Sequence, residues 1–228
     1  GGWQDSYGGI VPGFKVLSSE AGPEIQVQTK RLPLSEEWVQ EFNSRLLLIY
    51  TGKTRLAKNL MDTVLSKWSN RDKEIVDTMD RLVEDSGQCE LALTQGDFQA
   101  VGEIISRYYK DKMFLSSTTL NDPPVVAAML HHLDSMIDGA TLCGAGAGGF
   151  LAILIKQGQD RGHVMKAAKE AVALYHASQP RICACCNDKG GHQPECDCQE
   201  DEGEDIMWSW DATVDNTHGL VVTVGEEP

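Results

Sequence analysis

An aspartate in a glycine-rich segment is the first candidate for chemistry in this sequence. Asp5 lies at the centre of Gly-Gly-Trp-Gln-Asp-Ser-Tyr-Gly-Gly, and Gln4 precedes it. A carboxylate on a loop with little bulk around it can accept a proton from a substrate hydroxyl. An aspartate between glycines is also typical of an ordinary turn. The segment therefore offers Asp5 as a catalytic base, with a plain turn residue as the alternative.

A second candidate lies where an apolar strand over 46–50 meets a helix from about residue 55. Gly52-Lys53-Thr54 resembles the end of a phosphate-binding P-loop, but the glycine needed five residues before Gly52 is Leu47, which excludes that motif. Thr51, Lys53 and Arg55 remain at the junction, where backbone N–H groups, the helix dipole and two cations can meet an anion. The alternative is a capped helix start with solvated cations.

The third candidate is a run of small residues between Leu142-Cys143 and a strand over 151–155. It consists of Gly144, Ala145, Gly146, Ala147, Gly148 and Gly149. Glycine is costly inside regular structure, so such a run marks a turn where backbone approaches something closely. A bound anion, a substrate or a neighbouring chain segment would each fit, and so would a tight bend between strands with no ligand.

Six metal-ligating side chains lie in a stretch without apolar periodicity, 179–205, which also carries an acidic run. They are Cys183, Cys185, Cys186, His192, Cys196 and Cys198. Cys183 and Cys186 have the spacing of a zinc knuckle, whereas Cys196 and Cys198 are too close to form a second one. Zinc at Cys183, Cys186, Cys196 and Cys198 is therefore a hypothesis, and free thiols in a surface insertion are favoured over it.

Composition narrows the classes of partner. The formal charge of -14 over 228 residues argues against nucleic acid, because phosphate backbones bind to basic surfaces. No apolar run approaches the ~20 residues that cross a membrane, and residues 1–5 do not resemble a signal peptide. Seven cysteines, an odd number, favour a reducing, cytoplasmic setting. The missing initiator Met suggests an upstream part of the same polypeptide.

Alternating and helical patterns predict the elements that must position these groups. A hairpin is expected from strands over 14–18 and 25–32, and the segment from Ser35 to about Phe42 is expected to be a capped helix. Apolar stripes predict helices over 55–68, 75–93, 98–108, 123–137 and 164–175. Two closing strands are expected over 206–214 and 220–224.

Three segments together resemble the GHMP sugar-kinase superfamily and, within it, the fucokinases. They are residues 1–9, residues 46–57 (Leu-Leu-Leu-Ile-Tyr-Thr-Gly-Lys-Thr-Arg-Leu-Ala) and residues 142–151. The resemblance covers roughly residues 1–178. It implies an α+β fold, a GHMP C-terminal domain in which helices pack on one face of an antiparallel sheet. It assigns 1–50 to the end of an N-terminal kinase domain and 51–228 to the C-terminal domain, with 179–205 as an insertion.

The resemblance also implies a reaction: transfer of the ATP γ-phosphoryl group to the anomeric hydroxyl of L-fucose, giving fucose 1-phosphate for GDP-fucose salvage. By this resemblance, Asp5 corresponds to the catalytic aspartate of the superfamily. The substrate- or phosphate-binding residues would be Gln4, Thr51, Lys53, Arg55, Gly144, Ala145, Gly146, Gly148 and Gly149. The partners implied are a small sugar and ATP with Mg²⁺.

Two differences from the superfamily limit this expectation. Ser6 stands where glutamine commonly follows the aspartate. The Pro-x-x-x-Gly-Leu-Gly-Ser-Ser loop that holds ATP phosphates has no match in the sequence, so that loop and most Mg²⁺ ligands are expected upstream. We therefore expect these residues alone to be inactive. A heptose-phosphate kinase of the same superfamily and a non-catalytic metal-binding interaction module are the alternatives.

Overall fold

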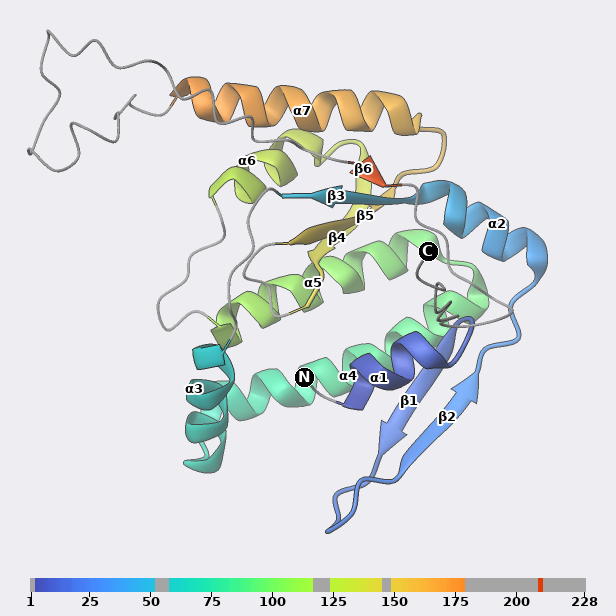
Figure 1. The fold of residues 1–228 in the computed structure, drawn as a ribbon. Helices are drawn as coiled ribbons and strands as arrows, with labels where there is room; N and C mark the ends of the chain where they lie inside the picture. The colour runs from blue at the N-terminus through green and yellow to red at the C-terminus, as the bar shows by residue number, and fades with distance from the viewer. Residues whose placement is uncertain (1–2, 52–57, 117–123, 145–148, 179–208, 211–228) are drawn as a thin grey trace, which may run out of the picture.

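The computed structural model describes residues 3–51, 58–116, 124–144, 149–178 and 209–210 (Figure 1). Helices and strands alternate irregularly along the chain. In order they are α1 (Trp3–Ile10), β1 (Lys15–Ser19), β2 (Val27–Arg31), α2 (Glu36–Arg45), β3 (Leu46–Tyr50), α3 (Lys58–Ser69), α4 (Lys73–Gln95), α5 (Phe98–Ser116), α6 (Pro124–Leu133), β4 (Ile137–Leu142), β5 (Phe150–Ile155), α7 (Arg161–Ser178) and β6 (Ser209–Trp210). No helix within these ranges is both long and apolar enough to cross a membrane.

The main sheet is antiparallel, with strand order β4-β5-β3-β6. Its register pairs Tyr50 with Phe150, and Leu142 with Leu151. The ends of β3 and β4 and the start of β5 therefore meet at one end of the sheet. β3, at the end of the predicted first domain, is a strand of this same sheet, while β1 and β2 form a separate antiparallel hairpin.

Two groups of helices cover the main sheet. Residues Leu151, Ile153 and Ile155 of β5 belong to the larger apolar cluster, together with buried residues of α6 and α7. Leu154 points the other way, because successive strand residues alternate. It belongs to a smaller cluster with residues of α2, α4 and α5. The predicted α+β class with an antiparallel sheet is confirmed. The prediction had helices on one face of the sheet, whereas residues of β5 pack against helices in both clusters.

Helix α5 lies against the edge strand β4 at a point where two glycines meet. A Cβ added at Gly102 would lie 2.5 Å from the backbone carbonyl carbon of Asp138, and a Cβ at Gly139 would overlap the carbonyl group of Gly102. Just beyond this contact the Ser106 hydroxyl accepts a hydrogen bond from the backbone N–H of Ala140, 3.2 Å away. The helix and strand are thus in contact through backbone, with no room for a side chain between them.

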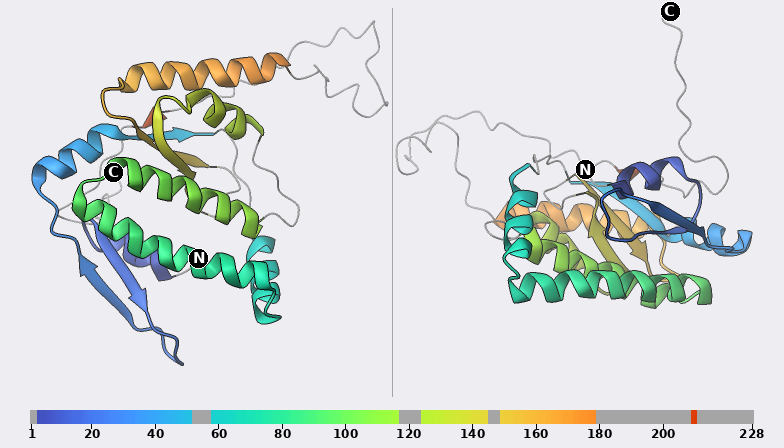
Figure 2. Two further views of the ribbon diagram at one scale, coloured as in Figure 1. Left: turned by 180° about the vertical axis from the view of Figure 1, so that it is seen from behind. Right: turned by 90° about the horizontal axis from the view of Figure 1, so that it is seen from below.

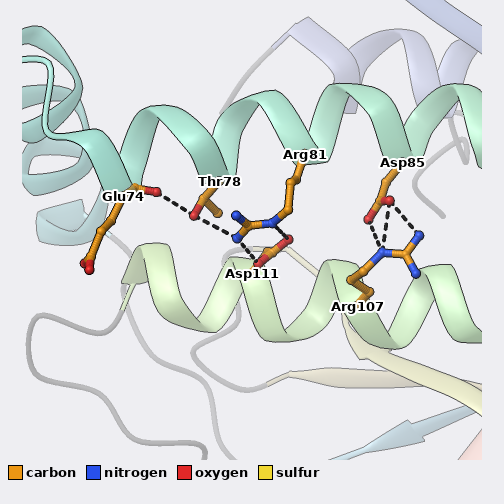
Figure 3. A network of polar contacts seen from close by, with 6 residues as sticks. All are labelled: Glu74, Thr78, Arg81, Asp85, Arg107 and Asp111. Carbon is orange, nitrogen blue, oxygen red and sulfur yellow. Dashed lines mark hydrogen bonds and ion pairs between the residues drawn. The ribbon is translucent and has the colours of Figure 1, made fainter.

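Helices α4 and α5 run side by side, as Figure 1 and the view from behind in Figure 2 show. Two ion pairs join them, as Figure 3 shows. Arg107 donates to both oxygens of Asp85, at 2.6 and 2.9 Å, and Arg81 donates to Asp111 at 2.8 Å. Both carboxylates are buried and both arginines are partly exposed. Bidentate pairing of this kind fixes the two helices in one register.

An aromatic cluster attaches the N-terminal part of the chain to α5. The rings of Trp38 and Phe98 stack at 4.9 Å between centroids, and Phe14 meets Phe42 edge-on at 5.0 Å. Ser35 caps α2 by accepting a hydrogen bond from the Trp38 N–H. The predicted capped helix is confirmed by this bond, and the predicted hairpin is confirmed by the antiparallel pairing of β1 with β2.

The structure corrects the sequence interpretation at several points. Asp5 was expected on a loop, but its backbone lies in α1. The helix expected over 98–108 continues to Ser116, because the apolar positions Tyr109 and Met113 extend its buried stripe. Ile137 was assigned to the preceding helix, which ends at Leu133; it instead begins β4, a strand that the sequence did not predict.

The contact between Gly102 and Gly139 yields a stability prediction. Gly139→Ala should lower the free energy of unfolding by about 2–3 kcal/mol, because the new methyl group overlaps backbone that cannot move aside. Urea unfolding measures this change. Gly87→Ala is the matched control: nothing lies within 4 Å of its added Cβ, and alanine is favoured over glycine in a helix. Equal unfolding midpoints for the two variants would contradict the close contact.

Candidate functional site

The end of the sheet where β3, β4 and β5 meet is the candidate site. Thr51 follows β3 and donates two hydrogen bonds to the Gly149 carbonyl oxygen, from its backbone N–H at 2.8 Å and from its Oγ1 at 2.9 Å. The backbone N–H of Cys143 donates to the Phe150 carbonyl at 2.7 Å. Thr51 therefore holds the last residue of the glycine run against the end of the sheet.

Glycine is required at both ends of the run by its backbone conformation. Gly144 has a φ of +69° and Gly149 a φ of +92°, a region that residues with a Cβ rarely adopt. Among the described residues, and apart from each glycine's neighbours in the chain, no heavy atom lies within 4 Å of a Cβ built at either position. The described residues around these two glycines therefore leave their backbone accessible to a ligand.

Lys112 contacts the other end of the run. This residue, in the last turns of α5, directs its Nζ at the Leu142 carbonyl oxygen, at the Gly144 carbonyl oxygen 3.2 Å away and at Thr141 Oγ1 3.4 Å away. Burial lowers the pKa of the Lys112 ammonium group, and the nearby Cys143 thiol acts weakly in the opposite sense. Loss of hydration raises the pKa of the Cys143 thiol, even though the side chain reaches the surface.

The opposite end of the sheet is closed by a buried ion pair. Arg45, the last residue of α2, pairs with Asp138 of β4 and donates from Nε to the Ile155 carbonyl oxygen at 2.8 Å. The side chains of Arg45 and Asp138 are only 9% and 7% exposed. The two ends of the sheet therefore differ: one is filled by side chains, and the other presents glycine backbone.

The structure thus places Thr51, Gly144 and Gly149 at the same end of the main sheet, while their role in binding stays a prediction. Asp5 and Gln4 lie on α1, a separate element, where Gln4 is exposed. Helix α1 is held by Lys15, whose Nζ donates to the carbonyl oxygens of Gly8 and Gly13. A positive charge near the C-terminal end of a helix interacts favourably with the helix dipole, and here it lies beside the two glycines in the last turn of α1.

Several predicted residues lie outside the described ranges. These are Lys53, Arg55, Ala145, Gly146, Gly148, Cys183, Cys186, Cys196 and Cys198. Their proposed roles stay predictions. Within the described ranges, no group of three His, Cys, Asp or Glu side chains is arranged to hold a metal ion.

Sequence reasoning missed Lys112, the cation that contacts the glycine run. Tyr108 was the last residue assigned to that helix from its apolar stripe, so Lys112 was assigned to no predicted element. The apolar residues at 105, 109 and 113 were the available signal, because their spacing of four continues the helical stripe. Nothing in the sequence places that helix beside the glycine run.

Comparison with known proteins identifies relatives for most of the chain, although no family model matches it. A bifunctional fucokinase/GDP-fucose pyrophosphorylase from Arabidopsis thaliana is 32% identical over 70% of this chain and 15% of its own length. An L-fucokinase/L-fucose-1-P guanylyltransferase from Bacteroides fragilis is 29% identical over 75% of this chain and 18% of its own. A heptose 7-phosphate kinase from Campylobacter jejuni is 26% identical over 68% of this chain and 44% of its own length.

A solved structure has a similar fold. The mevalonate kinase of L. major matches 70% of this chain and 44% of its own, with a TM-score of 0.51 and 15% sequence identity. Together these relatives agree with the resemblance drawn from the sequence. The chain fits a fragment of a GHMP-type kinase. The chain spans less than one half of the length of each of these relatives.

The pair of hydrogen bonds from Thr51 yields a prediction for the stability of this chain. Thr51→Val keeps the shape and the backbone bond but removes the Oγ1 donor, so stability should fall by about 1 kcal/mol. Amide exchange at Phe150 should become faster. Thr51→Ser retains the hydroxyl and should behave like the unchanged protein in both urea unfolding and hydrogen exchange. If the serine and valine variants lose protection equally, the hydroxyl is not what holds Gly149.

Proposed function

We propose that this chain is the C-terminal part of an ATP-dependent sugar kinase that phosphorylates the anomeric hydroxyl of L-fucose to give fucose 1-phosphate. The observation that carries the proposal is the similarity to two relatives whose names include fucokinase, at 32% and 29% identity over 70% and 75% of the chain. Those relatives are far longer than the matched segment, so the proposal concerns the whole protein of which this chain would be a part.

In this proposal the work is divided between two parts of the polypeptide. Asp5 orients or deprotonates the sugar hydroxyl, and Gln4 lies beside it. An upstream segment supplies the loop that binds the ATP phosphates and most of the Mg²⁺ ligands. Phosphoryl transfer depends mainly on positioning and electrostatic stabilisation, so each group must be held firmly rather than react covalently. The division at residue 50 between an N-terminal and a C-terminal domain is part of the proposal.

The glycine run forms one wall of the sugar pocket in the proposed enzyme. The positive φ values and open surroundings of Gly144 and Gly149 support this role, because a sugar can approach backbone most closely where no Cβ intervenes. Thr51 fixes Gly149 and begins the junction that carries Lys53 and Arg55. We assign to Lys53 and Arg55 the task of offsetting charge on the transferring phosphoryl group.

A heptose-phosphate kinase is the second candidate. The observation in its favour is the Campylobacter jejuni relative, of which the chain covers 44%, a larger share than it covers of either fucokinase. Such a substrate carries a phosphate group of its own. The cations at 53 and 55 would then bind that phosphate in the ground state as well as the transferring group.

Substrate specificity is tested with the full-length protein in an ATP-coupled assay against L-fucose, a heptose 7-phosphate and galactose. We expect L-fucose to give the highest kcat/KM. Asp5→Asn should lower kcat by at least about 100-fold, because it removes the general base. Glu24→Gln, an exposed carboxylate in the turn between β1 and β2, is the control and should leave kcat unchanged. A preference for the heptose phosphate would replace the fucose assignment, and full activity of Asp5→Asn would remove the role of Asp5.

The cations at the junction give a separate prediction. Lys53→Ala and Arg55→Ala should each lower kcat by about tenfold or more, since each removes a charge that favours the transition state. Lys169→Ala, an exposed lysine on α7, controls for the change in net charge. A higher KM for the sugar with kcat unchanged would indicate ground-state binding of a substrate phosphate instead. Unchanged kcat and KM in both variants would contradict any role at the site.

A further inference from the structure

The position of Lys112 indicates a role in the proposed reaction that no sequence motif suggested. We propose that Lys112 is a positioning residue. Its ammonium group holds the end of β4 and the first glycine of the run, Leu142 to Gly144, in the conformation that forms the pocket wall. The expected effect on catalysis rests on the proposed function. The contacts that carry it are properties of the described residues.

The acceptors around Lys112 match the bonding capacity of an ammonium group. Nζ has three N–H donors and no acceptor. It faces the Leu142 carbonyl oxygen, the Gly144 carbonyl oxygen at 3.2 Å and Thr141 Oγ1 at 3.4 Å. All three partners belong to the strand end and the start of the run. Lys112 is therefore engaged with protein oxygens, so it positions the backbone and does not act as a free cation for phosphate.

Helix α5 is firmly fixed where it presents this lysine. Gly102 contacts Gly139, Ser106 bonds to Ala140, and Lys112 reaches the end of the same strand. The residue before Lys112 is Asp111, which Arg81 of α4 holds from the other side (Figure 3). The α5–β4 contact thus continues from the start of the strand to the glycine run, and Lys112 is its last member.

The two ends of the run are held by different residues of the fold. Thr51 binds Gly149 at one end, and Lys112 binds Gly144 at the other. Without the lysine, the carbonyl oxygens of Leu142 and Gly144 lose a charged donor, and no described residue blocks the space beside the Gly144 Cα. A displacement of about 1 Å in a reacting geometry can cost 100-fold in rate, so the effect on a pocket wall should be measurable.

The test uses the full-length protein with Lys112→Met, Lys112→Arg and a control, Lys110→Met, which removes an exposed lysine from the same helix. Lys112→Met should lower kcat/KM for the sugar at least tenfold, mainly through KM for the sugar, with KM for ATP changed less than twofold. Lys112→Arg, which keeps charged donors, should recover at least half of the activity. Lys110→Met should match the unchanged protein.

Hydrogen exchange separates this inference from the proposed function. In Lys112→Met, amides from Thr141 to Gly144 should exchange at least tenfold faster, while those from Leu151 to Ile155 stay protected. Unchanged exchange at 141–144 would overturn the inference, and so would loss of protection throughout β5, which would indicate a general role in stability. If the unchanged protein phosphorylates no sugar, the proposed function fails alone, and exchange still decides whether Lys112 holds the run.

Discussion

The arrangement of this fold depends on the contact between Gly102 of α5 and Gly139 of β4. Because neither residue has a side chain, the backbones of helix and strand approach more closely than any other residue pair would allow. This close approach determines which residues the rest of α5 contacts. Val101 and Ile104 enter the smaller apolar cluster, Tyr109 and Met113 enter the larger one, and Lys112 arrives beside the glycine run. The ion pairs with α4, in which the carboxylates are buried and the arginines partly exposed, fix the rotation of the helix that makes these contacts possible.

The main sheet has two unlike ends, and the difference follows from its sequence. At one end Arg45 and Asp138 form a buried pair, and Arg45 also bonds to the Ile155 carbonyl and lies 4.4 Å from the centroid of the Phe98 ring. Removing one partner of such a pair leaves an uncompensated buried charge and typically costs 3–5 kcal/mol. At the other end Gly144 and Gly149 expose backbone. A site built there stands on a scaffold that is fixed at its far end, which suits a reaction that depends on positioning.

The sequence predicted those features that have local signals. Ser35 identifies a helix start, Gly96 ends α4 in a left-handed conformation, and the alternation over 25–32 indicates a strand. The sequence also proposed Thr51 and the glycine run as binding residues, and that role stays a prediction. The strand β4 was missed because Gly139 is a poor strand residue and Ile137 fits the stripe of the helix before it. The contact between Gly102 and Gly139 joins residues far apart in the chain, and so it leaves no local pattern. Lys112 depends on that contact and was missed for the same reason.

The proposed reaction must also be reconciled with an acidic protein, because ATP and phosphorylated sugars are anions and the chain has a formal charge of -14. The buried carboxylates near α5 do not add to the repulsion, since arginine neutralises each of Asp85, Asp111 and Asp138. Exposed charges are screened over roughly 8–10 Å at physiological ionic strength. Hydrogen bonds from backbone and from cations act at about 3 Å and are little affected by that screening. In the proposed reaction, binding would therefore depend on the groups within contact distance of the ligand, and the net charge would act mainly on the rate at which an anion approaches.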